Sequence, residues 1–181
     1  KKVGDMFKEK GKEISKADLA LFCSLVENNI DIIENEIEKL CSYTEGREIT
    51  PKDIYDLGSG KEDNDIFNLV EFLSQRKPQV ALDVLNELLF KGESVSVILR
   101  MIQRQFKLLF DIKLGICKGK SKDDLTQELK LHPYVCEKMM MQSKKFSIEQ
   151  LEKIINLCLN TEKNLKSTSV DEKTEMELLI I

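Results

Sequence analysis

Side chains able to do acid–base, metal or nucleophilic chemistry are sparse in this sequence and poorly grouped. One histidine, His132, and five cysteines without a CxxC pair are too few ligands for a transition-metal site. Glu34, Glu36 and Glu38 form a short acidic group, but helical spacing turns them in different directions, and with Lys39 they are typical of a solvated face. The sequence contains no GxxxxGKS/T phosphate loop. We therefore predict no catalytic residue, no cofactor and no metal, and expect the protein not to be an enzyme.

The cysteines indicate a reduced, cytoplasmic protein. Their number is odd and they are widely spaced, so most are expected to serve as small apolar side chains on helices. They are Cys23, Cys41, Cys117, Cys136 and Cys158. His132 directly precedes Pro133 and is expected to start a helix rather than to bind a ligand. Since the chain begins at Lys1 without Met, inside an expected helix, we interpret it as part of a longer protein.

One stretch of the sequence has the spacing of a helix-turn-helix, which raises the possibility of DNA binding. The stretch SKDDLTQELKLHPYVCEKMMMQSKKF would place Lys138, Lys144 and Lys145 on or beside the reading helix. That helix has no Arg, Asn or Gln at its start for base edges, and the chain is acidic, with a net charge of −4 and a pI near 5.3. Plain packing of two helices is the alternative interpretation.

The stretch from Ser94 to Gly119 is predicted to form the central helix. Its apolar residues cover an arc of roughly 220° on a helical wheel, so other elements must cover most of its circumference. The remaining polar stripe contains Arg100, Arg104 and Lys107, which suit either a subunit contact or solvated surface. These charges also exclude a membrane span. Gln105 lies inside the apolar arc and is expected to be buried with its amide paired.

The elements that position these residues are all predicted to be helices. Hydrophobic content of 41%, charged content of 33%, only 8 glycines and 3 prolines, and the absence of an alternating segment favour an all-α fold. Leu19, Phe22, Cys23 and Val26 are expected to form one apolar face. The segment from Gly58 to Asp63, with two glycines, a serine and three charges, is predicted to be an exposed linker between two domains, 1–58 and 59–181.

The order of several short segments resembles a known family. The run IIENEIEKLCSY…EITPKDIYDL resembles the helical lid of clamp-loader AAA+ modules. The segments NDIFNLVEFL, ALDVLNELLFKGE, ILRMIQRQFKLL, LHPYV, KKFSIEQLE and NLK resemble, in that order, the carboxy-terminal region of the δ subunit of the bacterial DNA polymerase III clamp loader. The resemblance implies a small AAA+ lid bundle at 1–58 followed by a larger helical collar domain at 59–181.

The resemblance also implies a function and partners. In that family the collars of five subunits pack into a ring, and δ is the subunit that does not hydrolyse ATP. We expect a non-catalytic fragment that assembles with the τ/γ and δ′ subunits, contacts the sliding clamp only through a first domain missing here, and meets DNA indirectly. Arg100, Arg104 and Lys107 are the candidate contacts with partner subunits. The alternative is a helix-turn-helix DNA-binding regulator that uses Lys138, Lys144 and Lys145.

Overall fold

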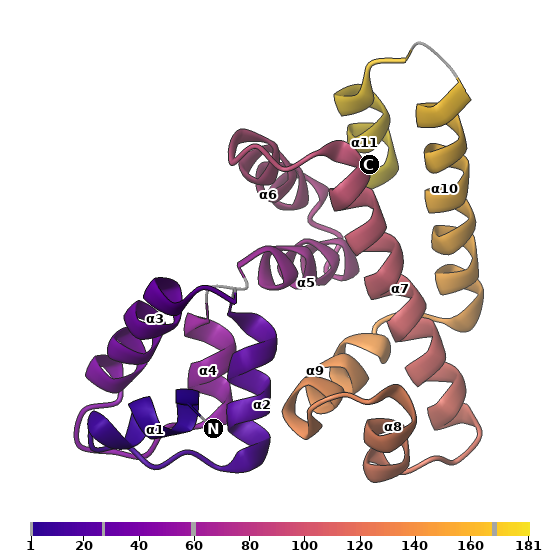
Figure 1. Cartoon of the computed structure of the whole chain (residues 1–181). Helices are drawn as coiled ribbons and strands as arrows, with labels where there is room; N and C mark the ends of the chain where they lie inside the picture. The colour runs from indigo at the N-terminus through magenta and orange to yellow at the C-terminus, as the bar shows by residue number, and fades with distance from the viewer. Residues whose placement is uncertain (1, 27, 59–60, 168–169) are drawn as a thin grey trace. The chain divides into compact units, whose positions relative to one another are not determined.

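The chain divides into two compact helical units. The computed structural model describes residues 2–26, 28–58, 61–167 and 170–181, and within these ranges every regular element is a helix, which confirms the all-α prediction (Figure 1). Unit 1 comprises Lys1–Asn64 and unit 2 comprises Asp65–Ile181. The division lies inside helix α5 (Lys61–Ser74), whereas the domain boundary predicted from the sequence lies between residues 58 and 59.

Unit 1 is a small bundle with its own apolar core. Its helices are α1 (Lys2–Glu9), α2 (Lys16–Leu25), α3 (Ile30–Tyr43) and α4 (Pro51–Leu57). Phe7 and Phe22 meet edge to face with ring centroids 5.1 Å apart, a geometry that aromatic pairs prefer. The other apolar and aromatic side chains buried in the described part of this unit are Leu21, Val26, Ile37, Leu40, Ile49, Ile54 and Tyr55. Burial of one such side chain contributes roughly 1.5–3 kcal/mol, so these residues account for the cohesion of the unit.

The helix starts of unit 1 follow the sequence signals closely. Ser15 caps α2 by accepting the Asp18 amide. At α4, the hydroxyl of Thr50 accepts the Asp53 amide while the Asp53 carboxylate accepts the Thr50 amide. The carboxylate of Asp53 also accepts two hydrogen bonds from the guanidinium of Arg47, at 2.7 and 2.8 Å. These donors outweigh the effect of burial and hold the pKa of Asp53 well below its usual range.

Two expectations for side chains in unit 1 are wrong. Cys23 is exposed and Leu21 is buried in its place, so the apolar face of α2 is turned from the predicted one. Leu19 is only partly buried. Glu36, expected to be solvated, is buried and pairs with Lys39 at 2.5 Å. Glu34 and Glu38 remain exposed, because their positions point away from the bundle.

The predicted linker from Gly58 to Asp63 is mostly not a linker. Gly58 is buried, and a β-carbon built on it would lie 3.4 Å from the β-carbon of Leu25. Residues 59–60 lie outside the described residues, and 61–63 belong to α5.

Unit 2 is built around helix α7 (Val95–Cys117), as predicted. The helix is capped by Ser94, whose hydroxyl accepts the Val97 amide. The other helices are α5, α6 (Pro78–Phe90), α8 (Lys122–Leu129), α9 (Pro133–Ser143), α10 (Ile148–Ser167) and α11 (Glu172–Ile180). Helix α7 packs against α9, α10 and α11 (Figure 1).

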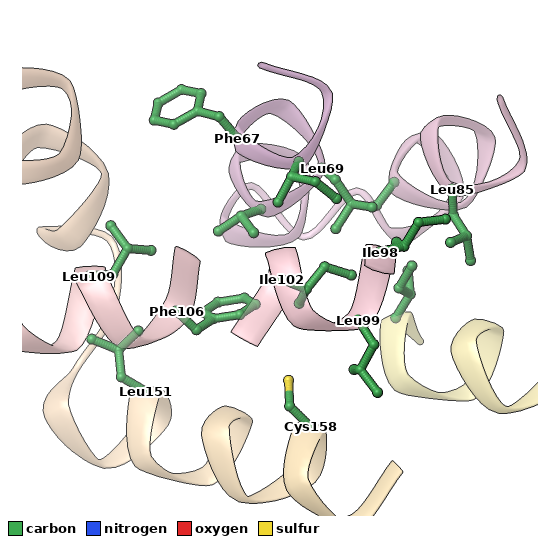
Figure 2. Packing of buried hydrophobic residues seen from close by; sticks show 14 of the residues in the cluster. Phe67, Leu69, Leu85, Ile98, Leu99, Ile102, Phe106, Leu109, Leu151 and Cys158 are labelled. Atoms are coloured by element: carbon green, nitrogen blue, oxygen red, sulfur yellow. The ribbon is translucent and has the colours of Figure 1, made fainter. Parts of the chain in front are cut away.

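The core of unit 2 surrounds α7 on more than one side. Figure 2 shows Leu69 of α5 and Leu85 of α6 on one side of α7, and Leu151 and Cys158 of α10 on the other. The α7 residues Ile98, Leu99, Ile102, Phe106, Leu109 and Ile112 are all at most 2% exposed. Phe106 also meets Phe146 edge to face, with ring centroids 5.8 Å apart. The middle of the wide apolar arc predicted for this helix is therefore covered, whereas residues at its edges, such as Met101, Leu108 and Phe110, are only partly buried.

One polar side chain of α7 is buried within this core. Gln105 is 8% exposed, and its Nε2 donates to Oε1 of Gln142 at 2.9 Å and contacts the Met139 sulfur at 3.2 Å. The prediction of a buried, paired amide is confirmed. Because an unpaired buried polar group costs about 1–3 kcal/mol, the Gln105–Gln142 pair favours a single arrangement of α9 on α7.

A glycine permits the close approach of α8 to α7. A β-carbon placed on Gly115 would lie 2.5 Å from Cδ2 of Leu125. Leu125 is 1% exposed and is the buried residue of α8. Its side chain therefore occupies the space above Gly115 that any larger residue would take.

We expect Gln105→Leu to destabilise unit 2 by about 1–2 kcal/mol, because Oε1 of Gln142 loses its buried donor. Urea unfolding followed by circular dichroism of the whole chain measures the change. Gln79→Leu, at an exposed position of α6, is the matched control and should stay within about 0.5 kcal/mol. Equal losses in the two variants would show that the Gln105 amide contributes nothing specific.

We expect Asp53→Asn to destabilise unit 1 at pH 7 by about 1–2 kcal/mol, since Arg47 is half exposed and its charge is partly screened. Because the folded-state pKa of Asp53 is lowered, its contribution is complete above the unfolded pKa near 3.9 and is lost as the pH falls below that value. The melting temperatures of the variant and the parent should therefore approach each other as the pH is lowered from 7 to 2. A difference in melting temperature that stayed constant with pH would contradict the assignment. Asp56→Asn, on the exposed side of α4, is the control.

Candidate functional site

The predicted cationic stripe lies on the exposed side of α7. Arg100, Arg104 and Lys107 are all exposed, although their neighbours along the helix are largely buried. Lys107 pairs with Asp111 one turn later, at 2.8 Å, and its Nζ lies 6.0 Å from the centre of the Phe110 ring. Within the isolated chain, Lys107 is therefore partly neutralised, and the stripe is best described as two arginines followed by an ion pair.

The stripe borders a polar seam between α7 and α10. Gln103 donates through Nε2 to a carboxylate oxygen of Glu162 at 3.0 Å and to the Cys158 carbonyl at 3.3 Å. The hydrogen bond from Lys166, then that from Gln103, and the nearby charge of Arg100 lower the pKa of Glu162. This seam keeps Glu162 ionised beside the stripe, so the exposed charges at this place are of both signs.

An apolar cleft lies within unit 2. Its volume is about 250 Å³. Helices α5, α7, α10 and α11 contribute to its lining, which is Leu69, Leu73, Ile102, Phe106, Phe146, Ile154, Leu157, Cys158, Leu178, Leu179, Ile180 and Ile181. Leu157 is 54% exposed and Leu178 is 65% exposed. Exposed apolar side chains that gather at one cleft indicate a contact site for another molecule more often than scattered ones do.

A thiol forms part of the wall of this cleft. Cys158 is fully buried, and burial raises the pKa of its thiol to about 11. Cys136 is also buried, whereas Cys23 and Cys117 are exposed and Cys41 is half-buried. The expectation that the cysteines act as buried apolar groups therefore holds for two of them and is wrong for Cys23 and Cys117.

The lysines considered for DNA contact lie on or beside α9, and two of them contact other parts of unit 2. The Nζ of Lys138 lies 4.8 Å from the centre of the Phe67 ring and 5.8 Å from that of Tyr134. Lys145 forms an ion pair with Glu71 of α5. Lys144 is exposed at the end of α9.

The remaining residues of α8 and α9 are used for packing. His132 caps α9, its Nδ1 accepting the Tyr134 amide at 3.2 Å, which confirms the expectation of a helix-start residue. Cys136 and Met139 of α9 are buried in the core of unit 2. Helix α9 therefore packs one of its sides against α7, as expected if α8 and α9 form a plain packed hairpin.

In the described part of the chain, the side chains that could act as acids, bases, nucleophiles or metal ligands do not form a cluster. Among its residues, no group of three or more His, Cys, Asp and Glu side chains could hold a metal ion. No helix in these ranges has the length and apolar character needed to cross a membrane. The surfaces that stand out are the α7 stripe and the apolar cleft, and both suit contact with another macromolecule.

Comparison with known proteins matches both units. Residues 63–181 match the family described as DNA polymerase III delta subunit, C-terminal domain. Residues 3–56 match a second family, described as a middle domain. The chain is 29% identical over 158 residues to DNA polymerase III subunit delta of Bacillus subtilis, an alignment that covers 87% of this chain and 46% of that protein.

A solved structure has the same fold. The Bacillus subtilis DNA clamp loader delta protein matches this chain with a TM-score of 0.71 and 27% sequence identity, over 98% of this chain and 53% of the other. The chain thus spans about half the length of the relatives it matches. These matches give no support to the alternative of a helix-turn-helix regulator.

We expect the cysteines to react with a thiol reagent in an order set by the structure. At pH 8, Cys23 and Cys117 should be modified at least about a hundredfold faster than Cys158, because Cys158 is buried and little of it is thiolate. Peptide mass mapping over time measures each rate, and full labelling in guanidinium is the control. If Cys158 reacted as fast as Cys117, the cleft would be more open than the structure indicates.

Proposed function

The chain belongs to the DNA polymerase III delta subunit family, and from this membership we propose that it acts as a non-catalytic part of a DNA clamp loader in replication. The observation that carries the proposal is the match of unit 2 to the family's C-terminal domain, supported by the likeness of the whole fold to a clamp loader delta protein. The mechanism we propose is positional. The helical units hold the subunit in the assembled loader, and the chemistry of ATP hydrolysis takes place in other subunits.

We further propose that residues 1–58 are the AAA+ lid and that residues 59–181 are the collar domain. The separate cores of units 1 and 2 support this division, although their border lies a few residues later. The match of residues 3–56 to a middle domain is consistent with a lid that follows another domain in the whole protein. In this proposal, the collar mediates assembly of a pentameric ring in the cytoplasm.

The proposed partners are the other clamp-loader subunits, τ/γ and δ′. The sliding clamp would be reached through a domain that does not lie within these residues, and DNA would be met indirectly. The carboxy-terminal unit offers two surfaces for the subunit contact. The α7 stripe, with Arg100 and Arg104, suits carboxylates of a neighbour, since guanidinium groups pair with them in a planar fork. The apolar cleft, with Leu157 and Leu178 exposed, suits apolar side chains of a neighbouring helix.

We expect two pairs of substitutions to weaken assembly with partner subunits. Arg100→Glu with Arg104→Glu should reduce affinity by about 2 kcal/mol, or roughly thirtyfold, if the arginines pair with buried carboxylates. Leu157→Asp with Leu178→Asp should have a similar effect if the cleft is covered by a neighbour. Because these side chains are exposed, the fold of the isolated chain should survive. Calorimetric titration or gel filtration with purified partner subunits measures the change.

The control for charge is Lys118→Glu, at an exposed position beyond the end of α7, which should leave assembly within about 0.5 kcal/mol of the parent. Unchanged assembly in the arginine variant would remove the stripe from the proposed interface, and unchanged assembly in the leucine variant would remove the cleft. If the whole chain bound no partner subunit, the proposal of an assembly role would fail.

The DNA-binding alternative predicts a different result. Changing Lys138, Lys144 and Lys145 to glutamate would then abolish duplex binding, whereas assembly would play no part. Two of these lysines already contact Phe67 and Glu71, so we expect this triple variant to lose stability rather than a measurable affinity for DNA. Salt-dependent, sequence-selective binding of the parent chain to a duplex would favour the alternative instead.

A further inference from the structure

One side of α9, together with Lys145 just beyond its end, contacts α5 through a row of polar residues. Gln142 donates through Nε2 to the backbone carbonyl of Phe67 at 3.2 Å and to the carboxylate of Glu71 at 3.3 Å. Lys138 lies over the Phe67 ring, and Lys145 pairs with Glu71. Phe67 itself is 8% exposed and lies on the side of α5 away from the labelled α7 residues in Figure 2. We call Lys138, Gln142 and Lys145 the polar clip.

The middle residue of the clip has hydrogen-bond partners for both its amide nitrogen and its amide oxygen. Gln142 is 1% exposed, its amide nitrogen donates to α5, and its Oε1 accepts from Gln105 of α7 at 2.9 Å. A shift of α5 along α9 would separate the amide from the Phe67 carbonyl and leave a buried group unpaired. The clip therefore has one arrangement in which every buried polar group has a partner.

Glu71 is held as a carboxylate in this arrangement. Burial by itself would raise the pKa of Glu71, but hydrogen bonds from Lys145, Gln75 and Gln142 together lower it. Gln75 lies just past the end of α5, four residues after Glu71, and donates to the same carboxylate at 2.8 Å. The acceptor of the clip is thus charged, and its hydrogen bonds are of the stronger, directional kind.

The apolar face of α5 supplies the larger share of its attachment but cannot select its position alone. Ile66, Leu69 and Val70 are at most 2% exposed, and burying each contributes roughly 1.5–3 kcal/mol. Apolar burial depends on area and has little directionality, so a rotated or shifted α5 could bury a comparable surface. Directional polar contacts are the feature that distinguishes one register from its neighbours.

We propose that the polar clip of α9 fixes the register and rotation of α5 on unit 2, so that α5 and α9 act as one rigid element. The proposal is independent of a role in a clamp loader. Helix α5 carries the chain from unit 1 into unit 2, because the division between them falls between Asn64 and Asp65. The clip therefore fixes, on the side of unit 2, the helix through which the two units are connected.

Two charge reversals at neighbouring positions test the clip in the whole chain. Lys145→Glu places a negative charge beside Glu71, whereas Lys144→Glu makes the same change at an exposed position one residue earlier. Hydrogen exchange of residues 66–74, measured by mass spectrometry, should become about three- to tenfold faster in the first variant and stay unchanged in the second. Exchange of α10 serves as the internal reference and should stay the same in both.

The reverse ion pair and a shape-conserving change complete the test. Glu71→Lys combined with Lys145→Glu should return exchange in 66–74 only partway toward the parent rate, because the opposite charges again face each other but a lysine at 71 cannot accept the hydrogen bond from Gln142. Gln142→Leu, which keeps the bulk of the side chain, should speed exchange in the same segment. Equal exchange of 66–74 in the Lys145→Glu and Lys144→Glu variants would overturn the proposal. A loss of protection spread equally over α5 and α10 would also overturn it, since the clip would then not act locally.

Discussion

The apolar surface of α7 is too wide for any single neighbouring helix to cover, and this constraint organises unit 2. Helices before and after α7 in the sequence must fold back onto it, which is why Leu69 of α5 and Leu151 of α10 meet the same central helix from different sides. The polar stripe with Arg100 and Arg104 is what remains when this covering is complete. The exposed face of α7 is therefore a consequence of the packing as much as of its own residues.

Local signals in the sequence predict most of the helices and their starts. Ser15, Thr50 and Ser121 cap helices because each hydroxyl accepts the amide three residues later, an interaction that depends only on nearby residues. Gln105 was predictable for a related reason, since its place in a long apolar arc leaves it no access to water. The face of α2 was predicted wrongly because a helix of ten residues gives its apolar pattern few repeats, so Leu21 and Cys23 exchange roles.

Contacts between residues far apart in the chain could not be predicted in this way. The sequence shows that Lys138 and Lys145 are cationic, but not that Phe67 and Glu71, some seventy positions earlier, meet them. The apolar cleft is of the same kind, because four helices contribute to it and no one of them shows it alone. The exposed position of the α7 stripe was predictable from the sequence. The hydrogen bond from Gln103 to Glu162 beside it was not, because it depends on where α10 packs. These features are decided by tertiary packing, which the helical periodicity of the sequence does not specify.

The glycine in the second half of α7 has a consequence for the order in which the chain folds. Glycine in a helix interior is less favourable than alanine by about 1 kcal/mol, so the segment around Gly115 is the part of α7 that forms least readily by itself. The contact with Leu125 that offsets this loss is made only when α8, which follows it in the chain, has been synthesised and has docked. We therefore expect the carboxy-terminal end of α7 to become stably helical only after α8 has docked, later than the amino-terminal half, whose neighbours α5 and α6 precede it in the chain.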